Sequence, residues 1–153
     1  MNHRPQFVAL TETHLAKATS SVNLSRYHLV SRLDRRPGQQ GGGVALFAVA
    51  GCENAIVHIA DSPIDERSWH IFHSDCGPML LCVWYRRPHQ GEIDSIKRFE
   101  QELDMHMAGC MAMVCVGDHN VHHKEWLRHS SSTTPEGREL EAVCISHGLR
   151  QFV

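Results

Sequence analysis

The sequence predicts one α/β domain over residues 1–153, because strand-length apolar runs dominate and two segments show helical periodicity. The clearest strand-like runs are residues 44–49, 79–85 and 111–116, each bounded by glycine, proline or charged residues. Residues 93–107 place apolar side chains at spacings of three or four with charges between them, as in an amphipathic helix. With 153 residues and 42% hydrophobic content, the chain can build one ordinary core.

The N-terminal half begins with a short apolar run at residues 7–10 that stops at Thr11-Glu12-Thr13. This pattern predicts a buried strand that places the Glu12 carboxylate at its C-terminal end. Residues 17–25 are polar and loop-like, and residues 27–30 predict a short strand. Three glycines at 41–43 then lead into the strand at 44–49. Because they precede a strand and not a helix, we favour a flexible turn over a phosphate-binding loop.

The second half continues with a strand at residues 54–60 and a polar stretch at 63–75, which predicts a loop or a short strand near 69–72. The strong strand at 79–85 is halted by Arg86-Arg87-Pro88 and therefore presents the Tyr85 phenol where it stops. The first helix, at 93–107, ends before glycine 109. A second helix begins at residues 134–135, a threonine cap followed by proline, and ends at glycine 148. Residues 149–153 predict a further strand.

The strand at 111–116 ends abruptly in Gly117-Asp118-His119-Asn120. Asp118 and Asn120 are two residues apart, so strand alternation would point both to one side of the sheet edge. A carboxylate can take a proton, and an amide can stabilise a developing oxyanion, which suits hydrolysis of a phosphodiester. Glu12 and Tyr85 also follow strand ends, and ligands gather where such ends converge.

Composition limits the classes of partner. A formal net charge of −2 gives no global attraction to nucleic acid, so polyanion binding would depend on local clusters, either Arg32, Arg35 and Arg36 or Arg86 and Arg87. We interpret these clusters as solvated surface. No apolar run approaches the roughly 18 residues of a membrane span, so no membrane association is expected. Six cysteines without a Cys-x-x-Cys pair favour free thiols in a reducing compartment, which predicts an intracellular protein of the cytoplasm or nucleus.

Thirteen histidines are scattered along the chain, and the only dense group is His119, His122 and His123. Adjacent side chains diverge in most backbones, so His122 and His123 are poorly placed to share an ion. The spacing does not favour a zinc site.

Four motifs occur in an order that is typical of one known superfamily: residues 10–15 (LTETHL), 41–46 (GGGVAL), 85–88 (YRRP) and 117–123 (GDHNVHH). Together they resemble the endonuclease/exonuclease/phosphatase superfamily, in particular the apurinic-endonuclease-like domain of non-LTR retrotransposons. Residues 133–153 also resemble that subfamily. The resemblance implies a DNase I-like four-layered α/β sandwich, in which two sheets pack face to face under outer helices.

The resemblance also implies a chemistry. Glu12 matches the carboxylate that holds a catalytic Mg²⁺, with Mn²⁺ as the alternative ion. Tyr85 matches the tyrosine that contacts the scissile phosphate, and Asp118 the acid that orients or deprotonates the attacking water. Asn120 matches the amide that supports the transition state. The expected substrate is DNA, and in the parent element a reverse transcriptase domain is expected to be linked to the nuclease.

The chain departs from the superfamily pattern at three places. His119 stands where the motif has an apolar residue, usually phenylalanine, and alternation would turn it toward a packing layer. The first strand with its asparagine, the helix after it, and the C-terminal Ser-Asp-His motif have no counterpart here. We therefore expect an incomplete sandwich, truncated at both ends, with impaired hydrolysis and self-association through open sheet edges.

Two alternative functions remain open from the sequence. One is a non-catalytic remnant that binds nucleic acid without cutting it, which the missing motifs and His119 favour. The other is a phosphatase of the same superfamily, against which the retrotransposon-like residues 122–126 argue.

Overall fold

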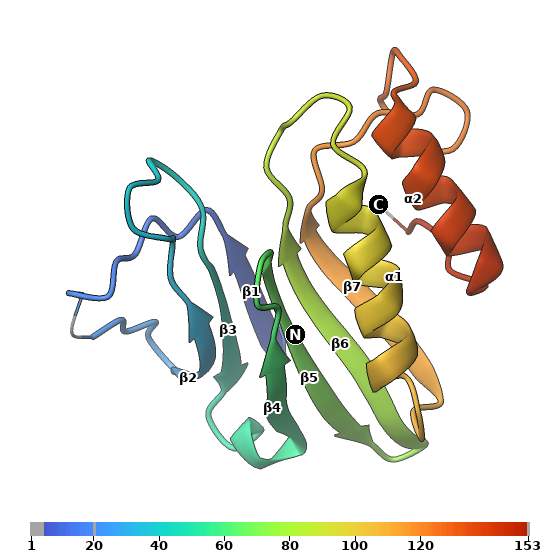
Figure 1. The fold of residues 1–153 in the computed structure, drawn as a ribbon. Helices are drawn as coiled ribbons and strands as arrows, with labels where there is room; N and C mark the ends of the chain where they lie inside the picture. Colours follow the sequence, from blue (N-terminus) through green and yellow to red (C-terminus); the bar gives the residue numbers. More distant parts are fainter. Residues whose placement is uncertain (1–4, 20, 153) are drawn as a thin grey trace. The chain divides into compact units, whose positions relative to one another are not determined.

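The computed structural model describes residues 5–19 and 21–152. That part of the chain forms seven strands, two α-helices and one 3₁₀ turn (Figure 1). In chain order these are β1 (Phe7–Thr11), β2 (Tyr27–Leu33), β3 (Val44–Val49), η1 (Glu53–Ala55), β4 (Ile56–Asp61), β5 (Glu66–Ser74), β6 (Gly77–Tyr85), α1 (Asp94–His106), β7 (Ala112–Asp118) and α2 (Pro135–Ser146). None of the helices in the described ranges is long and apolar enough to cross a membrane.

The chain divides into two compact units. The first comprises Met1–Tyr85 and His106–Asp118, and the second comprises Arg86–Met105 and His119–Val153. Every strand of the described residues belongs to the first unit, whereas α2 and nearly all of α1 belong to the second.

The first unit contains two sheets. β1, β3 and β2 form an antiparallel sheet in that order, and β4, β5, β6 and β7 form the other. Within the second sheet only the β6–β7 pair is parallel. Its register places Tyr85 directly beside Asp118, so the last residues of these two strands are neighbours.

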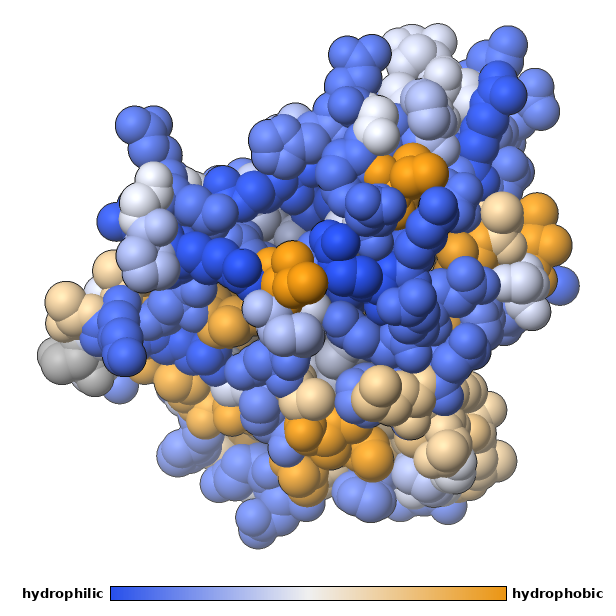
Figure 2. All heavy atoms as spheres, viewed as in Figure 1, coloured by the Kyte–Doolittle hydropathy of each residue, from blue (hydrophilic) through white to orange (hydrophobic). Residues whose placement is uncertain are grey.

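Among the described residues, the four edge strands expose apolar side chains. The exposed residues are Leu10 of β1 (40%), Leu29 of β2 (42%), Val57 and Ile59 of β4 (50% and 37%) and Val114 of β7 (41%). The surface in Figure 2 is largely hydrophilic and carries separate apolar groups. Edge strands offer unpaired backbone groups, and apolar residues beside them make such edges prone to pairing with other chains.

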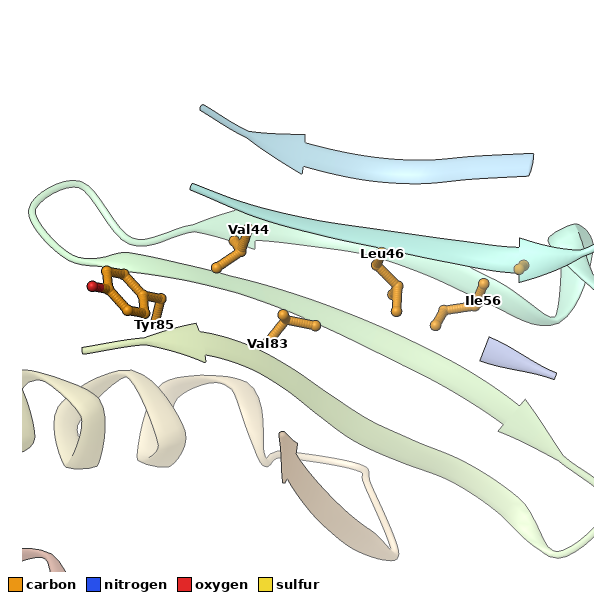
Figure 3. Packing of buried hydrophobic residues seen from close by; sticks show 6 residues of the cluster. Val44, Leu46, Ile56, Val83 and Tyr85 are labelled. Carbon is orange, nitrogen blue, oxygen red and sulfur yellow. The ribbon is translucent and has the colours of Figure 1, made fainter. Parts of the chain in front are cut away.

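The core of the first unit lies between the two sheets. Val44, Leu46 and Ala48 alternate along β3 and face the cluster from one sheet, while Ile56, Val83 and Tyr85 face it from the other (Figure 3). All six are at most 6% exposed. This packing confirms the predicted face-to-face arrangement of two sheets, and it places the phenol of Tyr85 at one end of the core.

The segment predicted as a loop or short strand near 69–72 is instead the nine-residue strand β5, a central strand of its sheet. Its first five residues are buried, and three of them are charged or imidazole side chains with partners. Arg67 lies 4.8 Å over the Trp84 ring and pairs with Asp65 at 3.2 Å. His70 contacts Ser31 Oγ at 2.6 Å. Because the polar groups are paired inside the protein, their polarity misled a prediction based on hydrophobic pattern.

The helices were predicted closely, but the strand predicted at 149–153 was wrong for the described residues 149–152. Val153 lies outside the described residues. The physical reason is the end of α2, where Gly148 adopts φ +66° and the Leu149 N–H donates to Cys144 O at 2.7 Å. This segment therefore completes the helix cap.

A substitution at Gly117 is expected to destabilise the pairing of β6 and β7. Gly117 has φ +141°, and a Cβ there would lie 1.9 Å from the Trp84 carbonyl oxygen. We expect Gly117→Ala to lower the free energy of unfolding by about 1–3 kcal/mol, measured by urea denaturation. Gly109→Ala is the matched control, because Gly109 also has positive φ (+81°) but nothing within 4 Å of its Cβ position. Equal losses in both variants would show that backbone strain alone matters.

Candidate active site

Glu12 follows the last residue of β1, in a backbone conformation with φ +52°. Its Oε1 accepts a hydrogen bond from the Tyr85 hydroxyl at 2.6 Å, and its Oε2 lies 3.0 Å from His14 Nε2. The side chain remains 43% exposed. Both oxygens are therefore oriented by neighbours, while the carboxylate still faces solvent, where a ligand could reach it.

Tyr85 is the last residue of β6 and is only 6% exposed. Its ring packs among the apolar side chains between the sheets, and its hydroxyl reaches Glu12 across 73 positions of sequence. Because the ring is buried and its hydroxyl contacts a carboxylate, the phenol of Tyr85 is held in a fixed position. The sequence prediction that Tyr85 stands at a strand end is confirmed.

Asp118 is the last residue of β7 and is exposed. Its register partner on the parallel strand β6 is Tyr85, so the two side chains emerge beside each other. Glu12, Tyr85 and Asp118 are thus brought together at one end of the first unit. The Glu12 carboxylate contacts the Tyr85 hydroxyl, the Asp118 carboxylate belongs to the neighbouring strand position, and both carboxylates have solvent access.

The glycine triplet at 41–43 lies beside Glu12. The Thr13 and His14 N–H groups donate to the carbonyl oxygens of Gly43 and Gly42 at 3.3 and 3.0 Å. A Cβ on Gly41 would lie 3.3 Å from Glu12 Oε2. The triplet leads directly into β3 and not into a helix, so its observed contacts are those of a turn that backs the Glu12 segment.

Asn120 belongs to the second unit, where it adopts φ +47°. β7 ends at Asp118, so the strand alternation used to place Asn120 beside Asp118, and to turn His119 toward a packing layer, does not extend to either residue. Asn120 is instead tied to Arg86: its Nδ2 donates to Arg86 O at 2.8 Å, and its carbonyl accepts from Arg86 Nη1 at 3.2 Å.

Arg86 was grouped with a solvated surface cluster, and the structure shows that this was wrong. It is 2% exposed, and its guanidinium donates to the backbone or side-chain oxygens of Ser95, Glu92, His89, His119 and Asn120. A five-donor planar fork can satisfy several carbonyl groups at once, which explains why arginine occupies this position. Arg86 therefore organises the loop that carries Asn120.

Two carboxylates of the second unit complete this network. Burial raises the pKa of Glu92, but hydrogen bonds from Ser95 and the charges of Arg86 and Arg98 outweigh it, so the pKa lies below its usual value. The same balance holds for Glu136. Burial raises its pKa, but backbone hydrogen bonds, including one from the Gly91 N–H at 2.6 Å, outweigh this effect, so the pKa lies below its usual value. Both groups are therefore anionic near neutral pH and balance the buried Arg86.

Among the described residues no three His, Cys, Asp or Glu side chains are placed to hold one metal ion, and this includes the histidines of the 119–123 segment. His123 is buried and has other partners: its Nε2 lies 3.1 Å from Glu141 Oε2, and its Nδ1 accepts the Trp126 N–H at 3.2 Å. His122 Nδ1 lies 3.3 Å from Ser130 Oγ. These contacts are structural and hold the loop that precedes α2.

A divalent cation is chemically compatible with the end of the first unit. Mg²⁺ keeps several waters and is bound by one or two carboxylates together with substrate phosphate, so it does not require a cage of three protein ligands. Glu12 offers a partly exposed carboxylate with a fixed orientation, and Asp118 offers a second exposed carboxylate beside Tyr85. These hard oxygen donors fit Mg²⁺ or Mn²⁺ better than they fit a soft metal.

Sequence reasoning missed the roles of Glu66 in the first unit and of Arg86 in the second. Glu66 is 6% exposed and is the register partner of Tyr85 on β5. It lay in the polar stretch interpreted as a loop, so nothing in the hydrophobic pattern marked it. Arg86 directly follows a strand end, which was a usable signal, but its position beside Arg87 suggested an exposed pair.

Comparisons with known proteins agree with this architecture. Residues 79–152 match the family model described as "Endonuclease-reverse transcriptase". Among solved structures, the chain is similar to the "Endonuclease domain of TRAS1, a telomere-specific non-LTR retrotransposon", with a TM-score of 0.51 and 13% sequence identity. The match covers 97% of this chain and 57% of the TRAS1 chain, so this chain spans little more than half of that structure. No curated protein matches. The predicted resemblance and the predicted DNase I-like α/β fold are confirmed.

Proposed function

We propose, from the match of residues 79–152 to the Endonuclease-reverse transcriptase family model, that this chain is part of a metal-dependent endonuclease domain that hydrolyses phosphodiester bonds in DNA. The observation that carries the proposal is the 2.6 Å hydrogen bond from Tyr85 to Glu12, at the strand end where Asp118 is the register partner of Tyr85. The proposal is supported by a carboxylate and a phenol in direct contact, with a second carboxylate one position across the β6–β7 ladder.

In this proposal Glu12 holds Mg²⁺, with Mn²⁺ as a substitute. The bound ion would neutralise charge on the phosphate as the transition state forms. Tyr85 and His14 keep the Glu12 carboxylate in one orientation, because each contacts a different oxygen. The Tyr85 hydroxyl lies close enough to this carboxylate to contact a phosphate oxygen bound there.

Asp118 is proposed to orient the attacking water and to accept its proton as the oxygen–phosphorus bond forms. The bond to the leaving oxygen breaks in the same displacement, so one strand of DNA is nicked. Asp118 is exposed, which gives a water access to its carboxylate. Asn120 is proposed to donate to a phosphate oxygen in the transition state, and its loop is held for this by Arg86.

DNA is the proposed partner, and its binding would rely on local positive charge. Arg86 is buried and is not part of the binding surface, whereas Arg36 is exposed and donates to Pro63 O at 2.8 Å. We further propose self-association through the apolar edge strands, an intracellular location, and linkage to a reverse transcriptase in the parent element. The exposed apolar residues on all four edges support the self-association.

Nicking of supercoiled plasmid tests the proposed activity. With Mg²⁺ we expect the chain to convert supercoiled to open-circular DNA, and Asp118→Asn to reduce the rate by roughly 10²-fold, because the proton acceptor is lost. Asp75→Asn is the matched control, since Asp75 is also exposed but lies in the turn at the opposite end of β6. It should nick at the wild-type rate.

Other outcomes of this experiment would favour other functions. DNA binding that weakens steeply with salt but produces no nicks would indicate a non-catalytic nucleic-acid-binding domain. Release of phosphate from inositol phosphates without plasmid nicking would indicate a phosphatase. Nicking that Asp118→Asn leaves unchanged would contradict the assignment of the site.

A further inference from the structure

Glu66 is a buried carboxylate that the proposed reaction does not use. It is the first residue of β5, is 6% exposed and stands opposite Tyr85 in the β5–β6 ladder. Directly opposite residues in such a ladder have side chains on the same face. Glu66 therefore points, like Tyr85, into the layer between the sheets. A buried acid needs strong partners there.

The partners of Glu66 include the glycine triplet. Its Oε2 accepts the Gly43 N–H at 3.1 Å. A Cβ on Gly42 would lie 2.2 and 2.4 Å from the two carboxylate oxygens of Glu66, so the carboxylate fills the space that any side chain would need. Gly42 and Gly43 have φ of +102° and +92°, which favours glycine. The main chain at residues 42–43 thus packs directly against the Glu66 carboxylate.

The same glycines support the segment that carries Glu12. Gly43 O and Gly42 O accept hydrogen bonds from the Thr13 and His14 N–H groups. Glu12 and His14 have φ of +52° and +56°, a region that L residues occupy only when surrounding contacts impose it. The contacts with the glycines are therefore part of what keeps Glu12 in this conformation.

We propose that Glu66 is a positioning residue for the metal-binding carboxylate. Glu66 holds the main chain at Gly42–Gly43 in place. These glycines hold the turn at residues 12–14, and that turn directs the Glu12 carboxylate toward the Tyr85 hydroxyl. The inference deepens the proposed function, since it rests on Glu12 as the metal ligand, but the geometry it describes can be tested without catalysis.

Fluorine NMR of Tyr85 provides that test. The chain has two tyrosines, so Tyr27→Phe leaves Tyr85 as the sole site for 3-fluorotyrosine and gives one resonance. Glu12→Gln defines the shift that follows when the Glu12–Tyr85 contact changes. We expect Glu66→Ala to move the resonance in the same direction, and Glu66→Gln, whose amide oxygen can still accept the Gly43 N–H, to keep it near the wild-type position.

Glu136→Ala is the matched control, because Glu136 is also a buried carboxylate (3% exposed) that accepts a glycine N–H, that of Gly91. Loss of a buried carboxylate of the other unit should leave the Tyr85 resonance in place. If Glu66→Ala does not fold, Glu66→Asp replaces it, since the shorter side chain should already move the resonance. A Tyr85 resonance that stays at the wild-type position in the folded Glu66→Ala or Glu66→Asp variant would overturn the proposal.

Plasmid nicking then separates this proposal from the proposed function. With an active wild type, Glu66→Ala should lower kcat by up to about 10²-fold, since misplacement of about 1 Å can cost that much. KM for DNA should change little, and Glu66→Gln should restore most of the rate. If the wild type does not nick DNA but the NMR shifts follow the expected pattern, the proposed activity fails and the positioning role of Glu66 stands. If the wild type nicks DNA but the Tyr85 resonance does not shift in the Glu66 variants, the proposed activity stands and the positioning role of Glu66 fails.

Discussion

Replacing Arg86 with methionine is expected to lower the free energy of unfolding by about 3–5 kcal/mol, among the largest losses that a single substitution in this chain should produce. Methionine can fill part of the volume but donates no hydrogen bonds. The carbonyl oxygens of Glu92, His119 and Asn120 would each lose a donor. The Glu92 carboxylate would lose its 3.3 Å contact with the guanidinium. Unmet buried polar groups cost about 1–3 kcal/mol each.

The measurement is urea denaturation of Arg86→Met followed by circular dichroism, with Arg86→Lys and Arg87→Met alongside. Lysine keeps the charge but not the planar fork, so Arg86→Lys should lose stability to an intermediate degree. Arg87→Met removes the same charge at the next position, which is less buried, and should cost under about 1 kcal/mol. Similar small losses in all three variants would show that the Arg86 network contributes little.

The same substitution bears on the proposed site through Asn120. The side chain and the main chain of Asn120 both contact Arg86, and its φ of +47° needs such support. In the folded fraction of Arg86→Met, the Asn120 side-chain amide should therefore exchange its hydrogens faster than in the wild type. An NMR spectrum in which this amide is unchanged would separate the stability effect from any effect on the site.

The sequence predicted the elements that bury either one apolar face or a continuous run of apolar residues. The spacing of Ile96, Phe99 and Leu103 marked α1, and all three are buried. The continuous apolar runs marked β3 and β6. β5 was predicted only as a loop or a short strand near residues 69–72, because its buried positions carry Glu66, Arg67 and His70, whose polar groups have partners inside the protein.

The candidate site was predictable to the extent that it depends on strand ends. Glu12, Tyr85 and Asp118 follow or occupy the last positions of strands, and the abrupt stop of each apolar run made this visible. The contact between Tyr85 and Glu12 depends on how one sheet faces the other, which no local pattern encodes. Asn120 lies beyond the end of β7, where the two-residue period of a strand no longer applies.

Acidification from pH 6.5 to about pH 4 is expected to remove about 3 kcal/mol of stability through His70 alone. Burial, with a further contribution from the nearby charge of His58, lowers the pKa of His70 from 6.5 to about 4. The ring is 0% exposed and lies between the sheets, with Nε2 2.6 Å from Ser31 Oγ of β2 and Nδ1 3.4 Å from Leu81 O of β6. Charging it there has no compensating carboxylate among these contacts.

The direction of the effect follows from the two pKa values. In the unfolded chain His70 takes up a proton near pH 6.5, whereas in the folded protein it does so only near pH 4. Between these values the unfolded state binds more protons, so stability falls as the pH falls, and above pH 6.5 the residue has no effect on the pH dependence. The pH dependence of the urea midpoint measures this directly.

Two variants isolate His70 from the other titrating groups. His70→Gln should flatten the fall in stability between pH 6.5 and 4, because glutamine can still contact Ser31 but takes up no proton. His73→Gln, an exposed histidine on the same strand, should leave the slope unchanged. The ring of His58 lies 5.3 Å from that of His70, and its charge contributes to the lowered pKa of His70. His58→Gln should therefore bring the pKa of His70 partly back toward 6.5 and shrink the loss, and a larger loss would contradict this coupling.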